Sequence, residues 1–589
     1  MDMKKNYVLA TVLVILVIVA NMFVQKKFAP KVEPIPETSV QSDAVQSTSP
    51  VNSVEKPVEV LSATDEETNL TEQTFVVETD LIRAVFTNKG GDIISYKLKQ
   101  HNVSGSTENV EMIENLTDNN RALSLALGDF NASAVNQIFN VKENIDAEGN
   151  KFISFFTNIH IKDAMGSDAV FTLGKHYKFL PDDYMFELVI TVDGVENFSG
   201  LHFGNIAYTL RTAPQIGPTW NKNDRYDFRQ FSAYINGKHK KTRVKAGDVK
   251  SFEGLSKWSA VSGKYFTFVV VPDSTPIQDI KFSAYTTNKS DKQVIENSQI
   301  FISRNATQSI SQDVYRIYIG PSSEKFLGKY SNPTKNTFGY SNLRIDEISS
   351  GSSFGFLYPV VVVLKFLLQW TYSIVKNWGI AIILVTILIK IILFPLSWKT
   401  MLGTQRIAPF QPRIQAVQKK YKSDPQKMQA ELDKIYKEAG YKPGCAGGCL
   451  PQILQFAVII AMFQLFNNYF EFRGASFIPG WISDLSVGDS VLKFSNPLPF
   501  LKWTDLRLLP IIYVATQYTS TLLNKQPMTE QTRSMMFVMM YVMPGIFFFL
   551  LYNAPAGLFV YWIVSNVLMV VQQFIINSII KKEKAVTKV

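Results

Sequence analysis

A lysine lies inside an apolar run of the sequence that is long enough to cross a lipid bilayer. The run is NWGIAIILVTILIKIILFPLSW, and it contains Lys390. A charged side chain at that depth costs about 3 kcal/mol on insertion-based scales. Thr386, Lys390 and Ser397 are spaced i, i+4 and i+11, so on a helix they fall within about 40° of one another. The pattern predicts a narrow polar stripe on an apolar helix, with one cation that could attract negative charge.

The five C-terminal apolar segments of the sequence hold no acidic residue or histidine in their interiors. They span about residues 378–398, 450–472, 507–523, 534–551 and 557–579, and Glu471 lies at the end of one. Because an intramembrane ion normally pairs or faces water, we expect a water-containing groove around Lys390. The alternative is that Lys390 bonds backbone carbonyls or a glutamine and joins two helices. The groove would be lined by amide and hydroxyl groups of the other segments: Gln452, Gln455, Gln464, Tyr513, Thr516, Gln517, Ser520, Tyr561, Ser565 and Gln572.

The same absence weakens several classes of function. A proton-coupled pump usually needs titratable groups at membrane depth, and an intramembrane protease needs His/Glu or paired Asp. The only cysteines, Cys445 and Cys449, have no histidine nearby, so they are expected to be reduced thiols. We therefore predict no catalytic residue, no metal site and no cofactor.

The N-terminus carries an apolar core from about Tyr7 to Val24, flanked by lysines. This core is longer than that of a cleaved signal peptide and lacks a small-x-small cleavage site. Residues 1–28 are therefore predicted to be an uncleaved signal anchor. Residues 29–72 are rich in Pro, Ser, Val and Glu, which predicts a flexible linker.

Residues 73–345 consist of short runs rich in Val, Ile, Phe and Tyr, separated by Gly, Pro, Asn and Asp. The stretch TFVVETDLIRAVFTNKGGDIISYKL alternates apolar and polar residues and breaks at Gly90-Gly91. This pattern predicts one large antiparallel β-sandwich domain. All five histidines lie in it, and we expect them to be ordinary structural residues: His101, His160, His176, His202 and His239.

Residues 354–375 place Lys365, Gln369 and Tyr372 on one helical face, which predicts an amphipathic helix lying in the membrane interface. Residues 378–580 then supply five crossings, and the N-terminal anchor makes six. The predicted fold class is a polytopic α-helical membrane protein with a five-helix core and a large antiparallel β-sandwich domain.

The distribution of charge predicts the orientation in the membrane. Residues 399–449 carry ten Lys and Arg against four Asp and Glu, and the tail at 581–589 is also basic, whereas the loop at 473–506 is near neutral. The positive-inside rule therefore predicts that 399–449 and both termini are cytoplasmic. The β domain would then lie outside the membrane, in the periplasm of a bacterium with two membranes.

The basic segment 399–449 is predicted to form a helical hairpin. In its first half, Ile414, Val417 and Tyr421 share one helical face. Asp424-Pro425 then signals a cap and first turn of a second helix, which should stop at Gly440. The basic face of this hairpin would suit phosphate-rich partners or lipid headgroups, or its charges only fix the topology.

Four stretches resemble the YidC/Oxa family of membrane protein insertases: PFQPRIQAVQKKY, AGGCLPQILQFAV, NWGIAIILVTILIK and LFVYWIVSNVLMVVQQ. The resemblance covers the whole chain, and the anchor, the large outer domain and the five-helix core match the form found in bacteria with two membranes. It implies a non-enzymatic insertase and chaperone of the inner membrane, which integrates nascent proteins alone or beside the Sec translocon.

The resemblance also implies a site and partners. The family's groove charge is usually arginine, and Lys390 stands in its place, which keeps the charge but loses the bidentate fork. Thr386 and Tyr561 match substrate-contacting positions, and Trp562 stands where some relatives have a second tyrosine. The implied partners are nascent membrane proteins, the Sec translocon with its accessory subunits, the lipid bilayer, and the ribosome and signal-recognition machinery near the hairpin. No sequence-specific nucleic-acid partner is implied. The predicted groove residues are Thr386, Lys390, Ser397, Gln455, Gln517, Tyr561, Trp562 and Ser565.

Two other functions stay open from the residues alone. One is a transporter or channel that uses Lys390 as a substrate counter-ion. The other is an envelope enzyme whose β domain acts on sugars.

Overall fold

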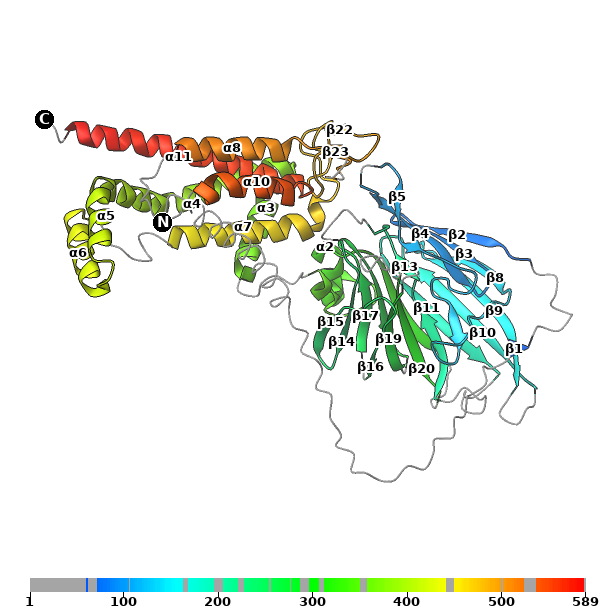
Figure 1. The fold of residues 1–589 in the computed structure, drawn as a ribbon. Coiled ribbons are helices and arrows are strands. Elements are labelled where there is room, and N and C mark those ends of the chain that lie inside the picture. The colour runs from blue at the N-terminus through cyan, green and yellow to red at the C-terminus, as the bar shows by residue number, and fades with distance from the viewer. Residues whose placement is uncertain are drawn as a thin grey trace, which may run out of the picture. The chain divides into compact units, whose positions relative to one another are not determined.

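The computed structural model describes residues 60–61, 71–104, 106–162, 168–194, 205–220, 227–253, 256–275, 277–285, 296–306, 312–349, 357–440, 450–498, 501, 503–523 and 537–586. These residues form two compact units, a β unit that ends at residue 349 and a helical unit that begins at residue 357 (Figure 1). The predicted anchor and the two cysteines lie outside the described residues.

The β unit is built from antiparallel sheets. The largest has the strand order β1-β9-β10-β11-β21-β18-β17-β14-β15, with β8 paired to β9, and a five-stranded sheet has the order β16-β19-β20-β12-β7. A four-stranded sheet, β2-β3-β4-β5, and the pair β13-β6 complete the unit. The strands are β1 (Val60–Leu61), β2 (Thr74–Glu78), β3 (Ile82–Thr87), β4 (Asp92–Asn102), β5 (Asn109–Glu111), β6 (Ile113–Glu114), β7 (Leu125–Leu127), β8 (Asn140–Ile145), β9 (Lys151–Lys162), β10 (Asp168–Phe179), β11 (Met185–Asp193), β12 (Ile206–Arg211), β13 (Gln215–Ile216), β14 (Gln230–Ile235), β15 (Lys238–Thr242), β16 (Val249–Glu253), β17 (Ser256–Ser262), β18 (Phe266–Pro272), β19 (Ile277–Tyr285), β20 (Asn297–Asn305) and β21 (Asp313–Pro321).

The prediction of a large antiparallel β domain is confirmed. The two largest sheets pack face to face, as β17 against β20, and Phe231 of β14 meets Phe282 of β19 with ring centroids 5.1 Å apart. Strand β1 lies within the predicted linker, since Val60 and Leu61 pair with Ile161 and His160 of β9. The sequence pattern at this point lacked the alternation by which the longer strands could be recognised.

A short helical segment follows β21 and covers part of the large sheet. It consists of α2 (Glu324–Leu327), η3 (Gly328–Ser331), η4 (Pro333–Lys335) and η5 (Ile345–Ile348). Tyr330 packs against Tyr318 of β21, and the indole of Trp258 on β17 donates to the Leu343 carbonyl over 2.9 Å. Because this segment shields the outer face of the central strands, β18 is buried on both faces, which explains its continuous apolar sequence FTFVVVP.

A buried ion cluster joins the strand after Gly90-Gly91 to the large sheet. The Lys175 ammonium lies 2.5 Å from Oδ1 of Asp92, and it also donates to the carbonyls of Gly90 and Leu123 at 2.9 Å. The Arg121 guanidinium donates from Nε to the other oxygen of Asp92 over 3.0 Å. Burial lowers the pKa of Lys175, although Asp92 opposes this effect. Removing one partner from such a cluster should be costly, because the remaining charges stay buried.

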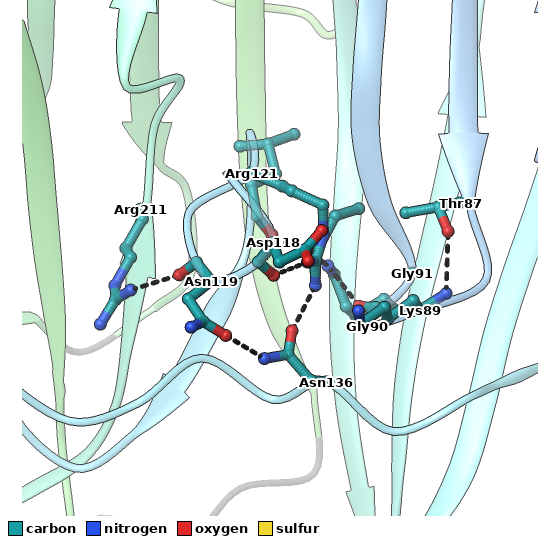
Figure 2. A network of polar contacts seen from close by, with 12 residues as sticks. Thr87, Lys89, Gly90, Gly91, Asp118, Asn119, Arg121, Asn136 and Arg211 are labelled. Carbon is teal, nitrogen blue, oxygen red and sulfur yellow. Dashed lines mark hydrogen bonds and ion pairs between the residues drawn. The ribbon is translucent and has the colours of Figure 1, made fainter. Parts of the chain in front are cut away.

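Asn136 extends this cluster to the neighbouring loops (Figure 2). Its side-chain oxygen accepts from Arg121 over 2.6 Å, and its amide donates to Oδ1 of Asn119 over 2.7 Å. Gly90 has a φ of +74°, and a Cβ there would lie 2.6 Å from the Val135 carbonyl. The predicted break at Gly90-Gly91 is therefore a tight turn that only glycine fits.

The helical unit contains the remaining elements. They are α3 (Tyr358–Val375), α4 (Trp378–Ile407), η7 (Ala408–Phe410), α5 (Gln411–Lys420), α6 (Pro425–Glu438), α7 (Leu450–Asn468), η8 (Phe470–Phe472), β22 (Leu492–Lys493), β23 (Asp505–Leu506), α8 (Leu509–Leu523), the π-helical turn η9 (Val538–Val542), α10 (Met543–Leu550) and α11 (Ala556–Val586). Helix α11 packs against both α4 and α8, and α3 packs against α4 and α7. Hairpin α5–α6 lies at one end of this unit and the β22–β23 pair lies at the other (Figure 1).

By length and composition, three of the described helices could cross a membrane, at Tyr358–Val375, Trp378–Pro395 and Ala556–Ile579. Two shorter apolar helices, Leu454–Asn468 and Met540–Leu550, accompany them. The predicted multi-pass helical character is therefore confirmed, whereas the count of six crossings stays a prediction.

Helix α3 turns its polar face toward the other helices. Gln369 donates to the Tyr469 hydroxyl over 2.8 Å, and Tyr372 stacks on Trp378 with centroids 4.0 Å apart. Its outer face is apolar, with Phe366 63% and Ile374 64% exposed. The predicted shared face of Lys365, Gln369 and Tyr372 thus contacts neighbouring residues of the helical unit, although Gln369 itself is exposed, and the outer face beside it is apolar.

Helices α5 and α6 pack against each other, whereas residues 399–407 of the hairpin predicted at 399–449 continue α4. Asp424 caps α6 by accepting from the Lys427 backbone N–H over 3.1 Å, and Gly440 follows the helix with a φ of +60°. A small core joins α5 to α6, and its buried members are Ile407, Ile414, Leu432 and Ile435.

Candidate functional site

The polar stripe of α4 divides into an inward and an outward part. Thr386 is buried, and its hydroxyl donates to the Ile382 carbonyl over 2.6 Å, so its hydrogen is used within the helix. Lys390 and Ser397 are only half-buried. The part of the stripe that could meet another molecule therefore consists of Lys390 and Ser397.

The Lys390 ammonium has no acidic partner among the described residues, whose ion pairs lie elsewhere. The neighbouring contact is to the backbone instead, since Nε2 of Gln572 on α11 donates to the Lys390 carbonyl over 3.4 Å. A glutamine does join the two helices here, but it does so through the lysine's main chain.

Helix α11 carries two polar stripes, which lie about 120° apart around the helix axis at 100° per residue and can therefore face different neighbouring helices. In the predicted stripe of Tyr561, Ser565 and Gln572, Gln572 contacts α4. The Tyr561 ring lies 6.5 Å from that of Phe466 on α7. The other stripe begins at Asn566, which donates to Oγ1 of Thr516 on α8 over 3.4 Å. Gln573 continues it and donates to Oδ1 of Asn577 over 2.9 Å.

This second stripe was missed by the sequence analysis. Its signal was the spacing i, i+7 and i+11 of Asn566, Gln573 and Asn577, which repeats the logic applied to α4. Asn566 and Gln573 are both buried, and Asn566 contacts α8. Asn566 joins α11 to α8, whereas Gln573 bonds within α11, and the stripe that contains Gln572 remains the candidate site.

The remaining predicted residues take different positions. Tyr561 and Ser565 are buried one turn apart on α11, and Trp562 is half-buried against Tyr513 of α8, with ring centroids 5.1 Å apart. Gln455 of α7 and Gln517 of α8 are half-buried. Among the described residues, neither glutamine side chain bonds to another member of the predicted set. The structure thus brings together Lys390 with Gln572 and Trp562 with Tyr513. Gln455 and Gln517 lie on the neighbouring helices α7 and α8.

Helices α4, α8 and α11 begin at a cap, whose described residues are 470–498, 501 and 503–508. Oδ2 of Asp489 accepts from the indole of Trp481 at 3.0 Å and from the backbone N–H groups of Leu508 at 2.8 Å and Leu509 at 3.1 Å. This carboxylate therefore caps the start of α8 and fixes the loop to it.

The cap also binds the starts of α4 and α11. The backbone N–H groups of Ala556 and Gly557 donate to the carbonyls of Val487 at 2.8 Å and Leu485 at 3.0 Å. Phe477 lies directly on Gly379, where a Cβ would come within 2.0 Å of its ring. Three helices are thus held at one end by a single loop. This arrangement was not predicted from the sequence, because the loop has no periodic pattern, although its acidic residues Asp484 and Asp489, which are buried in the structure, were a signal.

Among the described residues, no group of His, Cys, Asp and Glu could hold a metal ion. The fold and the site together define a class, a multi-pass helical membrane protein that carries a large β domain and polar side chains at membrane depth.

Comparison with known proteins identifies the family. Residues 370–584 match the family described as "60Kd inner membrane protein", and residues 74–345 match the "YidC periplasmic domain". A "Membrane protein insertase YidC" of Treponema denticola is 51% identical over 590 residues, which cover 98% of this chain and 100% of the relative. One of the same description from Treponema pallidum is 38% identical over 630 residues, which cover 99% and 100%. A solved structure, "Active YidC insertase crystal structure with the first transmembrane domain resolved", is 18% identical with a TM-score of 0.34, and the match covers 87% of this chain and 93% of that one.

The chain belongs to the YidC/Oxa family of membrane protein insertases and carries the YidC periplasmic domain. It is a multi-pass membrane protein that engages nascent membrane proteins and inserts them into the membrane, and it is not an enzyme. The predicted family, fold class and function are confirmed. The alternative function, an envelope enzyme whose β domain acts on sugars, is therefore excluded.

Proposed function

We propose that Lys390 attracts negative charge on the polar flank of an incoming membrane protein, while the apolar helices around it deliver the hydrophobic segment to lipid. The observation that carries this proposal is the half-buried Lys390 side chain on α4, which has no acidic partner among the described residues. Gln572 braces the backbone at this position without using the ammonium. The cation is therefore available to a transient partner.

The proposed groove around Lys390 is hydrated and lined by Thr386, Ser397, Gln455, Gln517, Tyr561, Trp562 and Ser565. Water and hydroxyl groups there lower the cost of moving a polar flank part-way into the membrane. The apolar substrate helix then gains transfer free energy as it leaves water for lipid. The sequence has no G-x-x-x-x-G-K-[ST] loop for a nucleotide, so we infer that partitioning drives the step.

The groove is open at the end of the helical unit that bears α5–α6 and closed by the cap at the other end. This orientation places residues 399–449 and both termini in the cytoplasm of a bacterial cell, beneath the inner membrane. It is supported by the excess of basic residues in 399–449 and by the periplasmic assignment of residues 74–345.

The α5–α6 hairpin meets the ribosome and the signal-recognition machinery, and the helical core works alone or beside the Sec translocon. The hairpin is supported in this role by its exposed lysines Lys420, Lys422 and Lys437. A surface of this kind attracts phosphate-rich partners. Residues 1–28 as anchor, most of 29–72 as linker, 354–375 as an interfacial helix and 581–589 as a basic tail complete the proposed organisation.

The proposal is tested with Lys390 variants and paired substrates. In depleted cells that express Lys390→Ala, insertion of a substrate with an acidic translocated tail should fall more than insertion of the same substrate with a neutral tail. Lys390→Arg should retain insertion of both, because the charge is kept. Lys365→Ala serves as the control, since that lysine lies over the Tyr469 ring and belongs to another helix. Equal loss for acidic and neutral tails in Lys390→Ala would refute the charge attraction.

A further inference from the structure

The cap carries a hairpin with an unusual surface. Strands β22 and β23 pair Leu492 with Leu506 and Lys493 with Asp505. The apolar side chains on this hairpin point away from the protein, with Val491 53%, Leu492 56% and Leu501 44% exposed. Apolar side chains gathered in this way mark a surface that contacts a partner or a membrane.

The hairpin lies beside the last turn of α10. Trp503 stacks on Tyr552 with ring centroids 3.6 Å apart and an interplanar angle of 4°. The same indole lies 5.8 Å from the Phe548 ring and 6.1 Å from the Phe549 ring. Because Phe549 itself is 60% exposed, the apolar surface of the hairpin continues the outer apolar surface of a helix in the membrane core.

The polar groups of the hairpin are arranged for the boundary between lipid and water. The Asp505 carboxylate accepts from Ser490 at 2.9 Å and from Thr504 at 2.8 Å, so its oxygens are satisfied inside the hairpin. Tryptophan and tyrosine favour the headgroup level, and a lysine can reach out from it, as Lys493 could here. The backbone is paired across the hairpin as well, from Phe494 to the Thr504 carbonyl at 2.8 Å.

We propose that the β22–β23 hairpin, whose described residues are 491–498, 501 and 503–506, is a membrane anchor. Its exposed apolar side chains insert into the boundary between headgroups and acyl chains at the capped end of the helices. The occupant of this surface is lipid, because the surface is continuous with the exposed face of α10 and bears aromatic residues at the level where that helix ends. This inference goes beyond the proposed role of Lys390 and does not depend on it.

The proposed anchor is connected to the residues of the cap that hold α8 and α11. Residue 491 follows Asp489 closely, and the Asp489 carboxylate holds the start of α8. The carbonyls of Leu485 and Val487 hold the start of α11. Lipid contact at the hairpin therefore braces the loop that joins these helices, and it sets the depth at which the cap rests.

The experiment uses the full-length chain in lipid nanodiscs, with Cys445 and Cys449 replaced by serine and a single spin label at position 492 or 501. Ser483, which is exposed on the same cap, receives the label as a matched control. We expect the labels at 492 and 501 to collide more with oxygen than with a water-soluble nickel complex, and the label at 483 to show the opposite order. Access to nickel at 492 and 501 would overturn the anchor, because the hairpin would then lie in water. Low access to both reagents would also overturn it, because protein would then cover the surface.

A second measurement uses no spin label, so its result does not depend on whether a label disturbs the fold. Leu492→Glu and Leu501→Glu should make the cap more sensitive to protease in nanodiscs, whereas Ser483→Glu should leave it unchanged. The same sensitivity for all three variants would contradict a specific lipid contact of the hairpin.

Discussion

Gln572 on α11 donates a hydrogen bond to the backbone carbonyl of Lys390 on α4, over 3.4 Å. This bond lies next to a weak point of α4, because Pro395 has no N–H to donate to the carbonyl of Ile391. The glutamine therefore stabilises the main chain beside the proline while the lysine side chain stays without an acidic partner among the described residues. The bond to Gln572 involves the backbone carbonyl of Lys390 and leaves the side-chain ammonium of Lys390 available.

This relationship predicts the effect of Gln572→Glu. The new carboxylate would lie within reach of the Lys390 side chain and would neutralise it as an internal partner. We expect insertion of a substrate with an acidic tail to fall more than insertion of its neutral-tail counterpart, as for Lys390→Ala. Asn577→Glu is the matched control, because position 577 belongs to the other stripe of α11 and is exposed. If both glutamate variants lowered insertion of the two substrates equally, the internal-partner argument would fail.

The helical periodicity of the sequence was sufficient to predict the stripe of α4, but not the direction of each member. Thr386, Lys390 and Ser397 share a face by spacing alone, yet Thr386 is buried while the other two are half-buried. The neighbouring helix determines which part of a stripe faces protein. The identity of this neighbour depends on packing between segments that are far apart in sequence. The same limit explains why the polar face of α3 was predicted and its contact with Tyr469 was not.

In the β unit, alternation predicted strands but not their partners. Strand β21 lies between β11 and β18, and these neighbours are separated from it by many residues of sequence. The buried cluster of Asp92, Arg121 and Lys175 arises from such non-local pairing. A lysine in the strand DAVFTLGKHYKF looks like an ordinary solvent-facing residue until its partner is known. The contacts of the cap could not be predicted for a different reason, because the sequence of a loop has no periodicity from which contacts can be inferred.

Gly379→Ala is predicted to destabilise the helical unit. A Cβ at this position would lie 2.0 Å from the ring of Phe477, so the cap would have to move. Overpacking of this kind costs about 1–3 kcal/mol, which exceeds the gain of up to about 1 kcal/mol from replacing glycine in a helix. Gly545→Ala is the control, because the nearest atom to its Cβ would be the Tyr518 hydroxyl at 3.9 Å. Thermal unfolding in detergent should show a lower transition for Gly379→Ala and an equal or higher one for Gly545→Ala, and the reverse order would contradict the packing argument.

Lys175→Met is predicted to destabilise the β unit and to spare insertion. The change removes the donor to Asp92 and to two backbone carbonyls, and breaking a buried cluster of this type costs about 3–5 kcal/mol. Lys178→Met is the control on the same strand, where the lysine is half-buried over the Phe152 ring. Proteolysis should degrade the β unit of the first variant faster, while membrane insertion of a two-helix substrate largely persists, as we also expect after deletion of most of residues 73–320. Loss of insertion in parallel with proteolysis would show that the helical unit needs a folded β unit.

The link between α5 and α6 should weaken at acidic pH. Nη1 of Arg413 lies 2.7 Å from Oε1 of Glu438, and this bond holds the pKa of Glu438 below its usual value of 4.5. Because the pKa is lower in the folded state, the stabilisation is complete above the unfolded pKa and is lost as pH falls through the folded one. Both side chains are exposed, so the effect should be small.

Hydrogen exchange of the α5–α6 amides tests this prediction when each variant is compared with the wild-type chain at the same pH. Arg413→Gln should reduce protection at neutral pH, and its protection should approach that of the wild-type chain as the pH falls through the lowered pKa of Glu438, where the wild-type carboxylate also becomes protonated. Lys434→Gln is the control, because Lys434 pairs with Glu431 within α6, 2.6 Å away, and does not join the two helices. It should leave the protection of α5 unchanged at neutral and at acidic pH. A constant difference between Arg413→Gln and the wild-type chain across this range would show that the two helices are held by their apolar core alone, through Ile414 and Leu432.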